Sequence, residues 1–265
     1  MGDHKAPGDK APQAPGPVPS IQDLSGVWVL VQKRVQSTVD ANITTQEKHL
    51  SSNIPLILKL QKIPWLVRKV IDSAPIHLHA TQYTSTDPKT NEPRIHLDLV
   101  QRSSVNIGIG DIEDNRILDW EERPHEDYVF GSVVTRSRYV TGVGFGEDED
   151  GKGARPDIHL SLDVGCEDGE RILRFLKGEI DADGGDCDGF LVEPWPGCDS
   201  ENAEGKGLWV QTLERSEKSA WTAETIWGFE MMNGERCLTT RVAAVDGKGD
   251  YQLGKCVFQL LSREC

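Results

Sequence analysis

Apolar and polar side chains alternate over most of residues 76–261, outside the segment 142–205, and this is the period of a β-strand with one buried face. Ile76, Leu78 and Ala80 begin this pattern, and Asn233-Gly234 separates two alternating runs as a tight hairpin turn does. The earlier run 26–33 is apolar on both faces. Strands are predicted at 26–33, 76–81, 95–99, 105–109, 116–122, 127–140, 207–215, 221–232, 235–245 and 251–261.

Residues 53–72 follow a different period. Apolar residues recur there at helical spacing on both sides of Pro64, which suits the opening turn of a second helix because proline lacks the donor that this turn leaves unused. Ser52 or Asn53 is placed to cap the first helix. The pattern predicts a short helix-turn-helix directly after the first strand.

A meander of about ten strands leaves two edges unless the sheet closes on itself. We therefore predict an all-β fold, an antiparallel up-and-down β-barrel, as a single domain over residues 21–262. Residues 1–20 are rich in Pro, Gly and Ala and predict a disordered tail. Residues 142–205 predict an insertion at a strand connection, mostly irregular because of its Gly and Asp content, with a hairpin or helix at 171–177.

The insertion also holds almost all of the net charge. It contains 18 acidic and five basic side chains, and therefore −13 of the −14 charges of the chain. Such an acidic surface disfavours binding to nucleic acid and docking on anionic lipid. No segment has the length or composition of a signal peptide or a membrane span, so we expect a cytoplasmic protein without membrane insertion.

No recognisable motif for cofactor or metal chemistry is present. The six cysteines show neither CxxC spacing nor pairing with histidine, and they are expected to be reduced in the cytoplasm. The acidic run 181–189 lacks the spacing of a calcium loop. We expect no cofactor and no metal, and the sequence leaves the oligomeric state open.

Several short runs together resemble the calycin superfamily. Gly26-Val27-Trp28 is similar to the Gly-x-Trp opening of lipocalins and fatty-acid-binding proteins, and the helical pair is similar to the lid of the latter. Other runs resemble lipocalin-like proteins of filamentous fungi: LSGVW (24–28), LKLQ (58–61), WLVRK (65–69), LDW (118–120), HEDYVFG (125–131), RSR (136–138), WTAE (221–224), WGF (227–229) and NGER (233–236). The resemblance covers about 21–140 and 206–262 and implies a barrel with an internal cavity. The last strand lacks the Arg-x-Tyr pair that commonly holds a fatty-acid carboxylate, so this specificity is not carried over.

An aromatic-rich cavity with a few polar groups is typical of a small-molecule site. Arginine beside aromatic residues can pair with an anionic group of a ligand. Alternatively, the arginines form an exposed basic face or pair with acidic side chains across the sheet, and the tryptophans pack in the core. The candidate ligand-binding residues are Trp65, Arg68, Trp120, Tyr128, Phe130, Arg136, Arg138, Trp221, Trp227 and Phe229. A second cluster contains three histidines and an aspartate, and we expect these side chains on the solvent face of a hairpin: His77, His79, His96 and Asp98. The alternatives are a polar patch inside the cavity or a metal site.

These observations predict a protein that encloses a small hydrophobic metabolite as a binder or carrier. The alternative is a cofactor-free cyclase or isomerase of the Diels–Alderase type in fungal secondary metabolism, since such catalysis needs orientation and a hydrogen-bond donor and leaves no motif. A third hypothesis is an interaction protein whose acidic insertion binds a basic partner. The sequence leaves open whether the chain is an enzyme.

Overall fold

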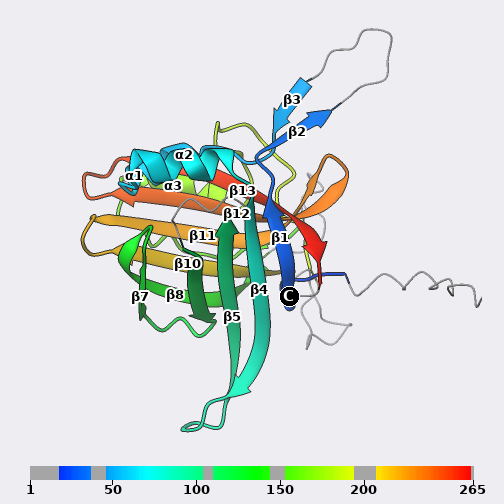
Figure 1. Ribbon diagram of the computed structural model, residues 1–265, viewed down its shortest axis with the longest axis vertical. Coiled ribbons are helices and arrows are strands. Elements are labelled where there is room, and N and C mark those ends of the chain that lie inside the picture. The colour runs from blue at the N-terminus through cyan, green and yellow to red at the C-terminus, as the bar shows by residue number, and fades with distance from the viewer. Residues whose placement is uncertain (1–17, 37–45, 104–109, 144–152, 194–206, 264–265) are drawn as a thin grey trace, which may run out of the picture.

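The computed structural model describes residues 18–36, 46–103, 110–143, 153–193 and 207–263. Its main element is an antiparallel sheet of 11 strands in the order β6-β5-β4-β1-β13-β12-β11-β10-β8-β7, with β9 paired to β8 (Figure 1). The strands are β1 (Gly26–Leu30), β4 (Ile76–Thr86), β5 (Pro93–Ser103), β6 (Ile112–Ile117), β7 (Arg123–Asp127), β8 (Gly131–Val143), β9 (Arg155–Pro156), β10 (Leu208–Ser216), β11 (Trp221–Met232), β12 (Glu235–Asp246) and β13 (Tyr251–Ser262).

The sheet curls until its two ends meet. Arg116 of β6 donates to Thr212 and Glu214 of β10, and the backbone N–H of Trp120 donates to the carbonyl of Ser137 in β8 at 2.8 Å. These contacts connect β6 and the loop after it to β10 and β8. In the described part of the chain no strand ladder links β6 to β7, so the sheet closes through side chains and one short bridge. The predicted all-β antiparallel fold of about ten up-and-down strands is confirmed.

Two helices cover one end of the curled sheet, α1 (Ile54–Leu60) and α2 (Trp65–Ser73), as the helical spacing predicts (Figure 1). Pro64 stands immediately before α2 as its N-cap. Asn53 precedes α1 in a left-handed conformation, but its side-chain amide donates to the carbonyl of Leu253 and does not cap the helix. None of the described helices is long and apolar enough to cross a membrane.

Three strand predictions differ from the structure. A separate hairpin of β2 (Lys33–Gln36) and β3 (Gln46–His49) stands between β1 and the helices. The strand expected at 127–140 begins only at Gly131, as β8, because a turn at 128–130 and a positive φ of 70° at Gly131 reverse the chain, and β7 before that turn was not predicted. The expected strand at 116–122 begins earlier, at Ile112, and ends at Ile117. The predicted strand at 105–109 lies outside the described residues.

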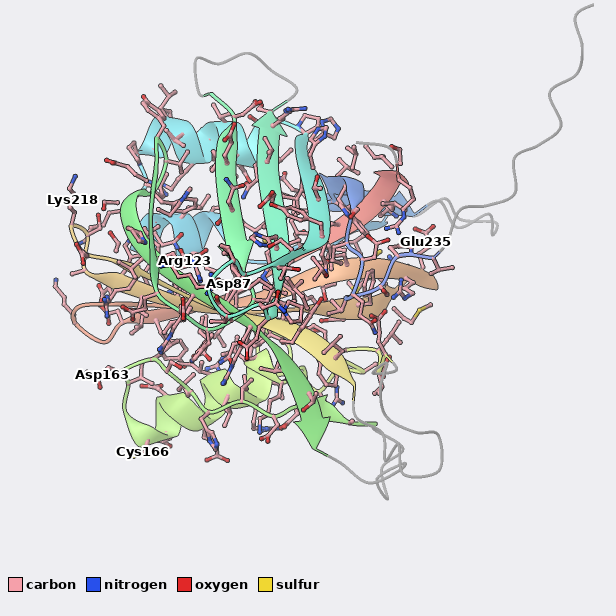
Figure 2. All side chains as sticks on the ribbon, turned by 90° about the horizontal axis from the view of Figure 1, so that it is seen from below. Asp87, Arg123, Asp163, Cys166, Lys218 and Glu235 are labelled. Atoms are coloured by element: carbon pink, nitrogen blue, oxygen red, sulfur yellow. The ribbon has the colours of Figure 1, made fainter. Side chains whose placement is uncertain are left out.

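The acidic segment is more ordered than its composition predicts. Its helix α3 (Cys166–Leu176) is preceded by 153–165 and followed by 177–193, which pack on the outer face of the sheet. Figure 2 shows α3 on the opposite side of the sheet from α1 and α2. Ile172 and Phe175 are fully buried against Trp209 and Ile226, so this segment completes a second, outer core.

The inner core lies on the other face of the same strands. Trp28 is 1% exposed, and its indole N–H donates to the carbonyl of Leu24. It packs with Leu78, Leu97 and Leu238 at one end of the curled sheet. The opposite end, under α1 and α2, is not filled by side chains, and the cavity lies there.

Candidate functional site

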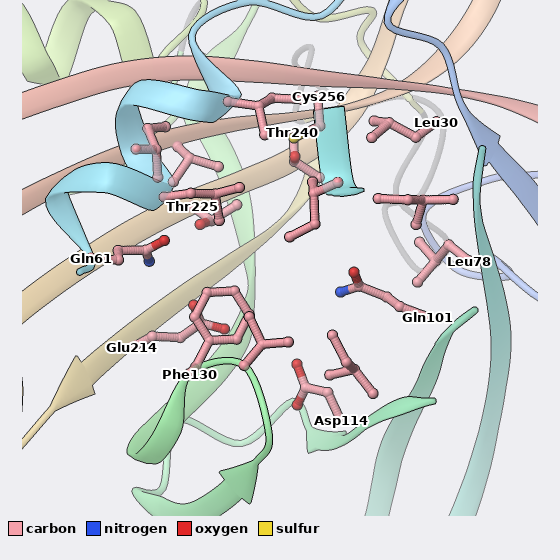
Figure 3. A pocket seen from close by; sticks show the side chains of 18 of the residues that line it. Leu30, Gln61, Leu78, Gln101, Asp114, Phe130, Glu214, Thr225, Thr240 and Cys256 are labelled. Atoms are coloured by element: carbon pink, nitrogen blue, oxygen red, sulfur yellow. The ribbon is translucent and has the colours of Figure 1, made fainter. Parts of the chain in front are cut away.

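A cavity of about 240 Å³ lies between the helical pair and the inner face of the sheet (Figure 3). A single water needs roughly 10–15 Å³ of such space, so the cavity has room for an organic molecule. Leu78 of β4, Val242 of β12 and Phe258 of β13 contribute to its walls. The side of the cavity next to the helices is lined by Ile54, Ile57, Leu58, Val67, Val70 and Ile71.

Three predicted ligand-binding residues line this space. Trp221 and Trp227 lie on the same face of β11, because they are an even number of residues apart in one strand, and Phe130 lies in the turn before β8. Phe130 contacts the ring of Trp221 edge-on, with ring centroids 6.1 Å apart. These three rings form an aromatic part of the cavity wall, and Phe130 and Trp221 pack in the same cluster as Ile57 of α1.

The polar part of the lining centres on Arg116. Its Nε donates to Asp114 at 2.7 Å, one Nη donates to Glu214 at 2.8 Å and the other donates to Thr212 at 2.9 Å. Its guanidinium also lies over the ring of Trp227, 5.4 Å from the centroid. Burial acts to lower the pKa of Arg116, but Asp114 and Glu214 outweigh burial and raise the pKa above its usual value. The arginine is therefore permanently charged and fixed in place.

Gln101 and the carboxyl group of Asp114 project into the opening in Figure 3. The uncharged side chains of Gln61, Thr225 and Thr240 line other parts of the wall. Burial raises the pKa of the Cys256 thiol to about 11, although a hydrogen bond with Thr240 acts in the opposite direction. Cys256 is therefore a thiol at neutral pH and not a ready nucleophile.

The other seven predicted residues lie outside the lining of the cavity. Trp65 and Tyr128 are exposed, at 62% and 76%, and the guanidinium of Arg68 donates to the carbonyl of Ile63. Phe229 is buried beside Trp28 in the inner core. Trp120, Arg136 and Arg138 form a separate stack on the outer face, with the two guanidinium carbons 4.4 and 4.3 Å from the centre of the Trp120 ring.

The register of β8 explains why Arg136 and Arg138 point outward rather than into the barrel as predicted. Ser137 is paired with Thr212 on β10, and the hydroxyls of these two residues, 3.1 Å apart, lie inside with Arg116. The residues on either side of Ser137 must then face outward. Arg138 donates to Gln211 on the outer face, at 2.8 Å.

Arg116, Asp114 and Glu214 were not predicted as site residues. The strand predicted at 116–122 leaves Asp114 outside it, whereas Asp114 lies within β6, two residues from Arg116 and on the same face. The sequence offered one signal for a strand here. Ile112, Asp114 and Arg116 alternate with Glu113 and Asn115, which the structure shows to be exposed. Glu214 comes from β10, which lies seven strands from β6 in the order of the sheet, and only closure of the sheet brings it to Arg116.

The histidine cluster is not assembled. His96 lies opposite Tyr83 and stacks on its ring, with centroids 4.7 Å apart, whereas His79 lies opposite Val100. The strand register therefore separates His96 from His77 and His79. Among the residues that the structure describes, no group of His, Cys, Asp and Glu is arranged to hold a metal, and Cys166, Cys187 and Cys256 are free thiols.

No protein-family model and no curated protein matches this chain. Among solved structures, a mutant of the REP1-NXSQ fatty acid transporter is similar over 90% of this chain and 98% of its own, with 9% identity and a TM-score of 0.38. The wild-type fluorescent protein UnaG is similar over 89% of this chain and 96% of its own, with 10% identity and a TM-score of 0.36. At these values neither likeness carries a conclusion about what this chain binds.

Proposed function

We propose that this chain is a calycin-type protein that encloses a small hydrophobic molecule in the cavity under α1 and α2. The observation that carries the proposal is an internal space of about 240 Å³ with aliphatic and aromatic walls and a small group of fixed polar side chains. This combination is what small-molecule sites show, since apolar walls supply affinity and a few polar groups set orientation. Phe130, Trp221 and Trp227 are the aromatic contacts that we assign to the ligand.

Native mass spectrometry of the protein purified from its source tests this directly. We expect a bound organic molecule that is released on denaturation. Binding of the neutral fluorescent probe Nile red to protein stripped of this molecule gives a second measurement.

A matched pair of variants locates the probe in the cavity. Val242→Phe adds a ring to the cavity wall, and we expect it to weaken Nile red binding by about tenfold because the ring takes the space of the probe. Val100→Phe makes the same change on β5 outside the cavity lining and should leave binding unchanged. Equal binding by both variants, or no binding by the native chain, would contradict the proposal.

A second candidate is the cofactor-free cyclase or isomerase. The observation that favours it is the pair of carboxyl groups, Asp114 and Glu214, on the border of an apolar space, because carboxyl groups placed in this way can hold or move a proton. A carrier releases its bound molecule unchanged after incubation, whereas an isomerase releases a product of the same mass and a different chromatographic retention time.

A further inference from the structure

We propose that the cavity selects ligands whose polar end is a neutral or cationic hydrogen-bond donor, such as a hydroxyl or an amine, over ligands that end in a carboxylate. This inference rests on the proposed binding function and concerns the same cavity. Its basis is the charge of the largely buried group Asp114–Arg116–Glu214, which contains two carboxylates and one guanidinium.

The three side chains are held together out of bulk solvent. The side chains of Arg116, Asp114 and Glu214 are 8%, 15% and 25% exposed, and all three line the cavity. Asp114 and Arg116 come from the edge strand β6 and Glu214 from β10, so the group also connects two strands that lie far apart in the order of the sheet. A ligand cannot push the arginine aside without breaking that junction.

The donors of Arg116 are already directed at protein acceptors. Its guanidinium has five N–H bonds, and Asp114, Glu214 and Thr212 accept four of them. An incoming carboxylate would have to compete with two carboxylates that already hold this cation. The two carboxylates of Asp114 and Glu214 and the guanidinium of Arg116 together carry a net charge of −1.

The other charged groups of the lining do not reverse this balance. Arg102 is half exposed, and its Nε donates to Asp111 at 2.9 Å, so an anion outside the cavity already pairs with it. His125 lines the same region and is partly exposed. Gln101 and Gln61 are neutral and offer both donors and acceptors.

The energetic consequence follows from the low dielectric of a buried site. A ligand carboxylate brought next to Asp114 and Glu214 would add a like charge, which is strongly unfavourable out of water. A hydroxyl or ammonium group would instead donate to carboxylate oxygens, and such charge-assisted bonds are stronger than neutral ones. The alkyl part would lie against Ile57, Val67 and Trp221.

Three probes of equal chain length test the selection: decylamine, decanol and decanoate, each used to displace Nile red from the full chain at pH 7.5. Nile red is chosen because it carries no charge that would bias the competition. We expect decylamine and decanol to displace it at concentrations at least about tenfold below that of decanoate. Decanoate binding as tightly as the other two would overturn the inference and leave the proposed function intact. Failure of Nile red and of all three probes to bind would instead contradict the proposed function.

A variant assigns the effect to the carboxylates. Asp114→Asn removes one of them and should reduce the preference for decylamine over decanoate by about tenfold, whereas Glu113→Gln removes an exposed charge next to it on the same strand and should not. Glu214→Gln removes the other carboxylate, on β10, and is the variant to use if Asp114→Asn does not fold. Equal preference in the native chain and in a folded variant would overturn the assignment.

Discussion

Glu230 is the anionic centre of a buried cluster on the outer face of the sheet. Arg241, which is fully buried, donates to it through Nε at 2.7 Å, and Lys255 Nζ lies 3.4 Å from its second oxygen. Arg241 also donates to the carbonyl of Ile180 at 2.7 Å, and Lys255 contacts Asp181 at 2.9 Å. The cluster therefore ties the segment after α3 to β11, β12 and β13.

The charge state of Glu230 gives a pH dependence. Burial acts to raise its pKa, but Arg241 and Lys255 outweigh burial and hold the pKa below the ordinary value of 4.5. For a carboxyl with a depressed pKa, the stabilisation is complete above its unfolded-state pKa and is lost as the pH falls through the folded-state pKa. We expect Glu230→Gln to lower the free energy of unfolding at pH 7 by about 3 kcal/mol, because Arg241 and Lys255 lose their buried anion.

The measurement is urea denaturation at a series of pH values. The curves of the native chain and Glu230→Gln should converge in acid, below the folded-state pKa of Glu230. Glu113→Gln, at an exposed site, should follow the native curve throughout. A constant difference between the native chain and Glu230→Gln down to the acid limit would show that the effect is not electrostatic.

At the scale of elements, the position of α1 on the sheet depends on a missing side chain. A Cβ at Gly254 of β13 would lie 2.6 Å from Ile57 Cδ1 and 2.9 Å from the carbonyl oxygen of Ser52. Ser52 pairs with the neighbouring Lys255 through two backbone hydrogen bonds, so it cannot move freely. Glycine at 254 thus allows the segment that starts α1 to lie directly on the strand.

Gly254→Ala should therefore displace α1 and destabilise the fold by about 1–3 kcal/mol through overpacking. Ile57→Val removes the clashing Cδ1 and should recover part of this loss when it is combined with Gly254→Ala, which a double-mutant cycle of unfolding free energies measures. Gly110→Ala, with no atom within 4 Å of the added methyl group, is the control. Strict additivity of the two substitutions would show that Ile57 is not the obstacle.

Helix α3 belongs to the core even though it lies in the strongly acidic segment 142–205. Phe175 is fully buried among Ile172, Phe190 and Trp209. Phe175→Ala should cost about 3–5 kcal/mol of unfolding free energy, the range for a buried aromatic, in a denaturant titration. His159→Ala, at an exposed position of the same segment, should change stability by less than about 0.5 kcal/mol. A small effect of Phe175→Ala would mean that the segment can detach while the barrel stays folded.

At the scale of the whole molecule, the net charge of −14 opposes the compact state, since it brings many like charges together. Salt at 0.15 M screens exposed charges beyond about 8 Å, whereas close buried pairs such as Glu230 and Arg241 are screened much less. Raising NaCl from about 10 mM to about 150 mM should therefore raise Tm by about 2 °C, as measured by calorimetry. Choline chloride should act equally if screening is the cause, and a fall in Tm would show that attractive surface pairs dominate.

The sequence predicted the features that depend on local periodicity. Alternation identified the strands from β10 to β13 within a few residues, and the apolar spacing on both sides of Pro64 identified α1 and α2. It was less accurate where turns contain apolar residues. The turn at 128–130, with Tyr128, Val129 and Phe130, has the apolar character of a strand, so the strand was predicted to begin at 127 rather than at Gly131, and β7 was not predicted.

Which face of each strand lines the cavity was decided by the tertiary structure. A strand presents two faces, and alternation alone does not say which is inner when both are covered, as they are for β8, β10 and β11, with the cavity on one side and the segment of α3 on the other. For this reason Arg136 and Arg138 were predicted inside, whereas Arg116 lies there. The sequence by itself determined most of the strands of the large sheet and the helical pair. The polar group of the cavity was determined only by closure of the sheet. Closure brings Arg116 on β6 to Glu214 on β10, 98 residues away, and this contact depends on register and curvature rather than on local pattern.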